Sequence, residues 1–130
     1  MKTKNKIIVV LVLFVGFVNA KAQSTWVAPK NADVISNPLK NDQTAIKKGK
    51  TLYMQLCAVC HGDKGKGDGV ASVALNPKPA NFMIDKFHKQ TDGAVFWKLT
   101  EGKPPMASNK ESLTETQRWQ LVIYLKSLKK

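Results

Sequence analysis

Apolar residues recur at helical spacing in three stretches of the chain, and no stretch keeps the alternation of a β-strand. From Ala45 to Leu56 they lie three and four positions apart, which places them on one face of a helix. A second helix is expected between Thr91, which can cap its start, and Gly102, which can end it. The pattern therefore predicts an all-α fold.

The last helix has the clearest start signal. Thr114 and Gln117 have the spacing of a capping box, in which each side chain bonds to the other residue's backbone N–H. The helix that follows carries a broad apolar face, formed by Trp119, Leu121, Val122, Ile123, Tyr124, Leu125 and Leu128. Gly49 lies inside the first helix and weakens it by about 1 kcal/mol relative to alanine. Another element is therefore expected to pack closely there.

The first 22 residues have the pattern of a secretory signal peptide. Residues 1–6 are basic, an apolar run follows from Ile7 to Val18, and Ala20-Lys21-Ala22 resembles a cleavage site. The run is shorter than the roughly 18 residues of a membrane span, and an uncleaved membrane anchor is the alternative. We expect an exported, periplasmic protein without an integral membrane span in its mature form.

Behind the signal, residues 23–40 are expected to form an irregular lead-in, and residues 41–130 a single domain. Without the signal's four lysines, 17 basic and 9 acidic residues give a net charge of +8. A basic exported protein suits an acidic protein partner or an anionic membrane surface. The sequence contains no nucleic-acid-binding motif, so nucleic acid is the least favoured partner.

Residues 57–61, Cys-Ala-Val-Cys-His, have the C-x-x-C-H pattern of covalent haem c attachment. Two thiols three positions apart can each add to a vinyl group on one edge of a haem. The adjacent His61 can then ligate the iron. Cys57, Cys60 and His61 are therefore the predicted attachment site for one haem.

Three other roles for a cysteine pair are a redox dithiol, a zinc site and a plain disulfide. A redox dithiol would be expected beside a βαβ pattern, which the chain lacks. A zinc site would need His88 as its fourth ligand, at a spacing uncommon in zinc fingers. A plain disulfide is possible in an oxidising compartment.

The second axial ligand should come from a distant loop, and the candidates are Met54, Met83, Met106 and His88. Met106 is favoured because Pro104 and Pro105 stiffen the non-helical segment that carries it. The other ring nitrogen of His61 is expected to donate to a carbonyl of the rigid loop over residues 77–79. The predicted metal ligands are therefore His61 and Met106.

Several motifs, in order, resemble the class I cytochromes c over residues 41–129. They are Gly49-x-x-x-Tyr53, Cys57 to Gly62, the Pro77–Phe82 loop, Pro105-Met106 and Trp119 to Leu125. The resemblance implies thioethers at Cys57 and Cys60 and axial ligation by His61 and Met106. It also implies that the first and last helices cross at Gly49 and Tyr53. Ala107 departs from the family, in which proline commonly follows the ligand methionine.

These features predict a single-electron carrier and not an enzyme, because both axial positions would be filled by the protein. Redox partner proteins with acidic surfaces are the expected partners, since lysines are expected to surround the haem pocket. These are Lys64, Lys66, Lys78, Lys103 and Lys110. The alternative is a haem subunit docked permanently in a larger oxidoreductase complex, and the sequence names neither electron donor nor acceptor.

Overall fold

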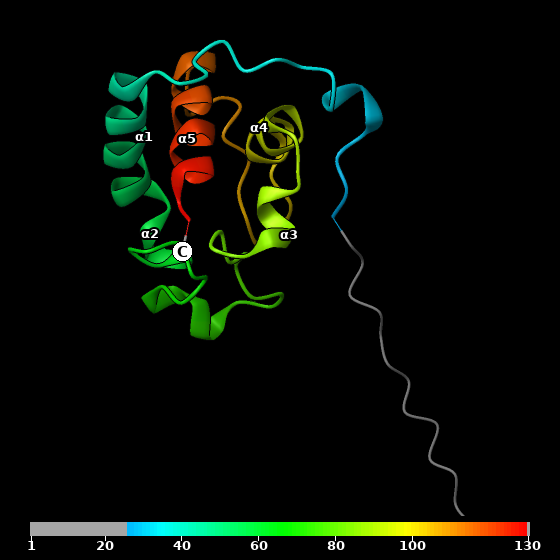
Figure 1. Ribbon diagram of the computed structural model, residues 1–130. Helices are drawn as coiled ribbons and strands as arrows, with labels where there is room; N and C mark the ends of the chain where they lie inside the picture. The colour runs from blue at the N-terminus through cyan, green and yellow to red at the C-terminus, as the bar shows by residue number, and fades with distance from the viewer. Residues whose placement is uncertain (1–25, 130) are drawn as a thin grey trace, which may run out of the picture.

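The structure is a computed structural model that describes residues 26–129. The predicted signal peptide, residues 1–22, lies outside the described residues. Two helices, α1 (Gln43–Leu56) and α5 (Glu115–Ser127), lie side by side and form the largest helix contact in the described chain (Figure 1). Helix α4 (Asp92–Glu101) packs against α5. The all-helical prediction is therefore confirmed.

Shorter elements connect these helices. They are the 3-10 turn η1 (Lys30–Ala32), helix α2 (Ala58–His61), the 3-10 helix η2 (Val70–Ala74) and helix α3 (Asp85–His88). Between residues 26 and 129, the sole β-type pairing is an isolated bridge between Lys103 and Met106. None of the helices in this range is both long enough and apolar enough to span a membrane.

Side chains cap the helices as their local sequence indicates. The Asp42 carboxylate accepts hydrogen bonds from the first N–H groups of α1, and the Thr91 hydroxyl accepts one from the Ala94 N–H of α4. The capping box of Thr114 and Gln117 is complete at the start of α5. Gly102 ends α4 with a φ of +67°, a conformation that favours glycine. The starts of α1, α4 and α5 and the end of α4 are therefore fixed by contacts within a few residues.

The core is built where α1 meets α5. Tyr53, Leu121 and Val122 are its largest fully buried side chains, and the rings of Phe96 and Trp119 stack at 4.0 Å between centroids. Gly49 lies at the closest approach of the two helices. A Cβ placed on Gly49 would lie 1.9 Å from the Gln120 carbonyl oxygen. The missing side chain is thus what allows the two backbones to touch.

We predict that Gly49→Ala destabilises the protein although alanine favours the helix. The gain in helix propensity is about 1 kcal/mol, whereas overpacking against a backbone carbonyl costs about 1–3 kcal/mol or more. The expected net loss is about 2 kcal/mol in the free energy of unfolding, measured by denaturant titration of the purified protein.

The matched control is Lys50→Ala, an exposed position next to Gly49 on the same helix. It should change stability by less than about 0.5 kcal/mol. A Gly49→Ala variant as stable as the wild type would show that α1 and α5 do not touch at this point.

Candidate functional site

A cavity of about 840 Å³ reaches into the core, and its wall includes Cys57, His61 and Met106. These residues come from α1's end, from α2 and from the loop after α4. Cys60, the fourth predicted site residue, is half-buried on α2 and is not among the lining residues. The volume is within the range of about 300–1,000 Å³ that small-molecule and cofactor sites occupy. The rest of the wall is largely apolar, with Phe82, Phe87, Val95, Leu99 and Leu125.

Cys57 connects α1 to α2, as the C-cap of the first and the N-cap of the second. Its N–H donates to the Tyr53 carbonyl at 2.8 Å, which continues α1, and its own carbonyl accepts the His61 N–H at 2.9 Å, which closes α2. Burial, followed by the nearby Cys60, raises the pKa of Cys57 to about 11. The Cys57 thiol is therefore protonated at neutral pH, and both cysteines are free.

The His61 ring is held from two sides. Its Nδ1 lies 3.1 Å from the Ala80 carbonyl oxygen, and its plane stacks on Phe82 with the centroids 4.5 Å apart. A carbonyl can only accept, so this contact requires the proton on Nδ1 and leaves Nε2 with its lone pair. Burial lowers the pKa of His61, against the opposite effect of the Ala80 bond. The neutral imidazole, the form that ligates metals, is thereby favoured.

The prediction that residues 77–79 supply this carbonyl is wrong by one residue. The Pro79 carbonyl oxygen faces Gly67, where a Cβ would lie only 2.4 Å from it. The next carbonyl, that of Ala80, faces His61. The carbonyl comes from the residue that directly follows this stiff loop. The direction of each carbonyl depends on how the loop packs against the glycine-rich segment, residues 62–69.

The glycine-rich segment, residues 62–69, folds back on α2. Its N–H groups at Gly67 and Gly69 donate to the His61 and Cys60 carbonyls at 2.7 and 3.1 Å. These bonds satisfy the carbonyls at the end of α2. From the other side, the buried Tyr53 hydroxyl donates to the Gly62 carbonyl at 2.6 Å. The motif is therefore fixed by hydrogen bonds on both sides.

The loop that carries Met106 is tied to α4 and α5. Lys103 and Met106 exchange backbone hydrogen bonds of 3.0 and 2.8 Å. The Ser108 hydroxyl donates to the Thr100 carbonyl at 2.7 Å, and the Asn109 amide to that of Leu99 at 2.9 Å. Further along, the Arg118 guanidinium donates to the carbonyls of Lys110 and Leu113. These bonds hold the loop in the position in which Met106 lines the cavity.

The other candidates for the second axial ligand do not line this cavity. Met54 is 43% exposed and borders a separate surface groove beside α2. His88 is half-buried: its ring packs edge-on against Phe87 at 5.3 Å, and its Nε2 atom is buried.

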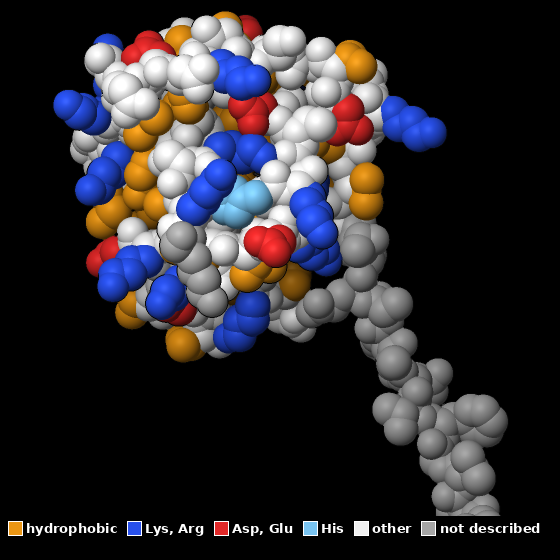
Figure 2. Space-filling view, viewed as in Figure 1, with side chains coloured by type: hydrophobic (Ala, Val, Ile, Leu, Met, Phe, Trp, Pro, Cys, Tyr) orange, Lys and Arg blue, Asp and Glu red, His pale blue; other side chains and the backbone are white. Residues whose placement is uncertain are grey.

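Lysine side chains line the cavity, and blue Lys and Arg side chains are spread over the face shown in Figure 2. Of the five lysines expected there, Lys78 lines the cavity, while Lys64 and Lys66 line the groove beside α2. Sequence reasoning missed other lining residues, namely Trp26, Val27, Ala28 and Asp33 of the lead-in, and Lys86, Lys89 and Lys98. For Lys98 a signal existed, because it follows the buried Ala94 and Val95 by four and three positions and so shares their face of α4.

The arrangement suits a flat, largely apolar cofactor. Cys57, His61 and Met106 line one space, Cys60 lies three residues after Cys57 on α2, and aromatic and aliphatic side chains form much of the wall. Within residues 26–129, no three His, Cys, Asp or Glu side chains are grouped so as to hold a metal ion on their own. The donor set fits a haem, whose iron brings four nitrogen ligands with it.

Comparisons with known proteins identify the family to which the chain belongs. Residues 46–129 match the cytochrome c family. Among solved structures, a chain of the Kuenenia stuttgartiensis reducing HAO-like protein complex Kustc0457/Kustc0458 is 30% identical, with a TM-score of 0.57. The match covers 73% of this chain but only 46% of that one.

Two further structures are similar. The KustC0563 c-type cytochrome is 30% identical with a TM-score of 0.56, over 63% of this chain and 98% of that protein. Cytochrome CL from Methylophaga aminisulfidivorans has the same fold at 21% identity, with a TM-score of 0.55 over 71% of this chain and 60% of that one. No curated protein sequence gives a significant match. Because the family match spans more than half of the sequence, the chain belongs to the cytochrome c family, whose members use haem to carry electrons.

Proposed function

We propose that this chain carries single electrons with one haem, bound through thioethers at Cys57 and Cys60 and ligated by His61 and Met106. The observation that supports this most directly is that Cys57, His61 and Met106 line one cavity although Met106 is far from the other two in sequence. A haem with these ligands would supply a one-electron couple whose potential is raised by the thioether.

The chain's own residues keep the site rigid. The Ala80 carbonyl and the Phe82 ring hold the imidazole of His61 in one orientation, and the ties of the 103–113 loop hold Met106. Two protein ligands leave no open coordination position for a substrate. Electron transfer benefits from such a fixed geometry because little rearranges between the oxidised and reduced states, which suits a carrier and not an enzyme.

The chain is further proposed to act outside the cytoplasm. The pattern of residues 1–22 supports export, and c-type haem attachment needs both thiols reduced until the bonds form. Export then imposes a condition, since an oxidising compartment would otherwise pair Cys57 with Cys60.

A second candidate function is that of a haem subunit within a larger oxidoreductase. The similarity to a chain of the reducing HAO-like protein complex favours it, although this chain spans less than half of that protein. Size-exclusion chromatography of the native extract separates the two: a free carrier elutes at the size of one small protein, a subunit with its complex.

The first prediction concerns covalent attachment. Protein matured with haem should keep its visible absorption after denaturation in acid and organic solvent. Cys57→Ser combined with Cys60→Ser should lose that colour completely, because no bond then ties the haem to the chain. Met54→Ala, on the exposed groove, is the control and should retain it. A wild type that loses its colour on denaturation would refute the thioethers.

The second prediction concerns the sixth ligand. Met106→Ala should keep the haem attached but lose the sulfur-to-iron charge-transfer band of the oxidised protein. The reduction potential should fall, because a thioether favours the reduced iron. If the band persists in Met106→Ala and vanishes in Met83→Ala or Met54→Ala, the assignment of Met106 is wrong.

The third prediction concerns the lysines. Oxidation of the reduced protein by anionic ferricyanide should slow as salt rises from about 0.01 M to about 1 M, over which the screening length falls from about 30 Å to about 3 Å. Oxidation by the cation tris(phenanthroline)cobalt(III) should speed up instead, since the field around the site is positive.

The matched variants are Lys66→Glu, beside α2, and Lys48→Glu, exposed on α1. Both change the net charge equally. Lys66→Glu should flatten the salt dependence with ferricyanide more than Lys48→Glu does. Rates that ignore ionic strength, or equal effects of the two variants, would mean that the local lysines do not steer the oxidant.

A further inference from the structure

The lead-in supplies part of the cavity wall, although it precedes the family match at residues 46–129. Trp26, Val27, Ala28 and Asp33 all line the cavity. Ala28 and Ala32 are buried against Ala94 of α4. A Cβ on Gly93 would lie 2.0 Å from the Ala32 carbonyl oxygen, so glycine is what lets the lead-in cross α4 this closely. The small residues at the start of α4 thus allow this segment to pack closely against the helix.

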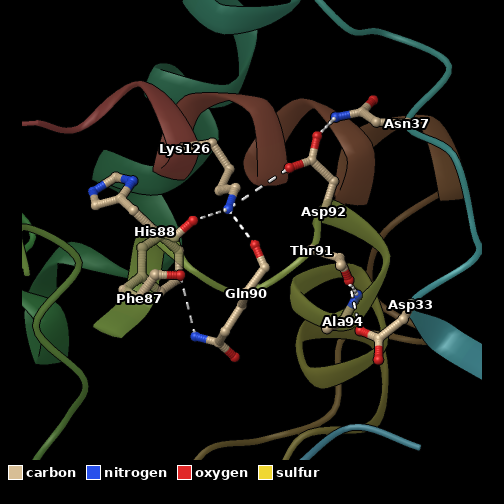
Figure 3. Close-up of polar contacts among 9 residues, drawn as sticks. All are labelled: Asp33, Asn37, Phe87, His88, Gln90, Thr91, Asp92, Ala94 and Lys126. Carbon is tan, nitrogen blue, oxygen red and sulfur yellow. Dashed lines mark hydrogen bonds and ion pairs between the residues drawn. The ribbon is translucent and has the colours of Figure 1, made fainter. Parts of the chain in front are cut away.

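Polar contacts fasten the lead-in to the rest of the fold (Figure 3). The Thr91 hydroxyl donates to the Asp33 carboxylate at 2.8 Å, and the Asn37 amide donates to Asp92 at 2.9 Å. Asp92 in turn lies 3.9 Å from the Lys126 ammonium of α5. The segment is therefore held by α4 directly and by α5 through Asp92, as a fixed wall of the cavity.

Lys98 reaches from α4 toward this wall. Its ammonium lies 5.8 Å from the centre of the Trp26 ring and donates to the Gln90 side-chain oxygen. The residue is half-buried, and no ion pair found within residues 26–129 includes it. Burial, reinforced by Lys86, lowers the pKa of Lys98, while Asp33 acts in the opposite direction. A half-buried ammonium that forms no ion pair can bind an anion through a charge-assisted hydrogen bond.

The net charge of the cavity lining also favours an anion. Among the described residues, the cavity wall carries four lysines, Lys78, Lys86, Lys89 and Lys98, against one carboxylate, Asp33. The Lys78 ammonium is already engaged by the carbonyls of Ser72 and Val73. The described part of the cavity wall therefore has an excess of positive charge.

The geometry of a haem matches the two ends of the cavity. Its vinyl groups, which would bond to the cysteines, lie on one edge, and its propionate carboxylates lie on the edge away from them. Figure 1 shows α2 and the lead-in on opposite sides of the molecule, and the cavity has lining residues from both. With the vinyl edge at Cys57, the carboxylates would lie away from it, on the side where the lead-in and α4 supply Trp26 and Lys98.

We propose that Lys98, held by Gln90 and covered by Trp26, binds a haem propionate, and that the lead-in closes the pocket over that carboxylate. The proposal rests on the proposed haem site. The lead-in then gains a role: it keeps water from the Lys98–propionate contact, which strengthens a charge-assisted hydrogen bond. Lys98 acts as a positioning and charge-compensating residue, since it does not touch the iron.

The test is the reduction potential as a function of pH. A carboxylate beside a cation has its pKa lowered by about 1–3 units, so Lys98→Gln should move the propionate inflection of the potential–pH curve upward by about that amount. Lys98→Arg keeps the charge and should leave the curve near that of the wild type. The matched control, Lys48→Gln, removes one exposed lysine of α1 and should not move the inflection. Trp26→Leu should give a smaller upward shift, by admitting water.

Other charged or titratable side chains also line the cavity: Asp33 on the lead-in, Lys78 on the stiff loop, Lys86 and Lys89 around α3, Tyr53 on α1 and the site residues Cys57 and His61. The wild type therefore gives a second, direct readout. In protein with carbon-13-labelled propionates, NMR should show one carboxylate that titrates well below the other. Two carboxylates with ordinary pKa values, or a Lys98→Gln curve identical to that of Lys48→Gln, would overturn the proposal. Failure of the wild type to hold haem would instead refute the proposed function.

Discussion

The contact of α1 with α5 at Gly49 is the constraint on which the site depends. Because the two backbones touch there, the next turn of α1 places Tyr53 against Tyr124, with ring centroids 5.2 Å apart. The Tyr53 hydroxyl then bonds to the Gly62 carbonyl at 2.6 Å. A helix pair that only needs to bury apolar surface thus also determines where Cys57 and the turn after it lie.

The two predicted axial ligands are positioned by different parts of the fold. His61 is oriented by the segments that fold back over α2, through a carbonyl and a stacked ring. Met106 is positioned by a loop whose bonds run to α4 and, through Arg118, to α5. Most of these bonds are to backbone carbonyls, whose acceptor strength does not depend on pH. The positions of both residues are therefore determined largely by hydrogen bonds to the backbone of packed segments.

Helix α4 connects this frame to the lead-in. One side of it packs on α5, its start accepts the lead-in at Gly93, and its Lys98 reaches into the cavity. An N-terminal segment that precedes the family match thereby becomes part of the cavity. The cavity wall as a whole carries more positive than negative charge, which a bound carboxylate would partly compensate. The proposed attachment chemistry and the proposed charge compensation lie in different parts of the chain.

The sequence alone determined whatever depends on neighbours a few residues apart: the helices, the Thr114–Gln117 capping box, and the C-x-x-C-H motif. It also predicted that another element would pack on Gly49, because a glycine inside a helix destabilises that helix unless close packing requires it. Tertiary structure decided which carbonyl meets His61 and which lysine enters the cavity, as Ala80 and Lys98 show. The physical reason is that local hydrogen bonds are encoded by spacing, whereas a carbonyl's direction and a side chain's surroundings exist only once distant segments have packed.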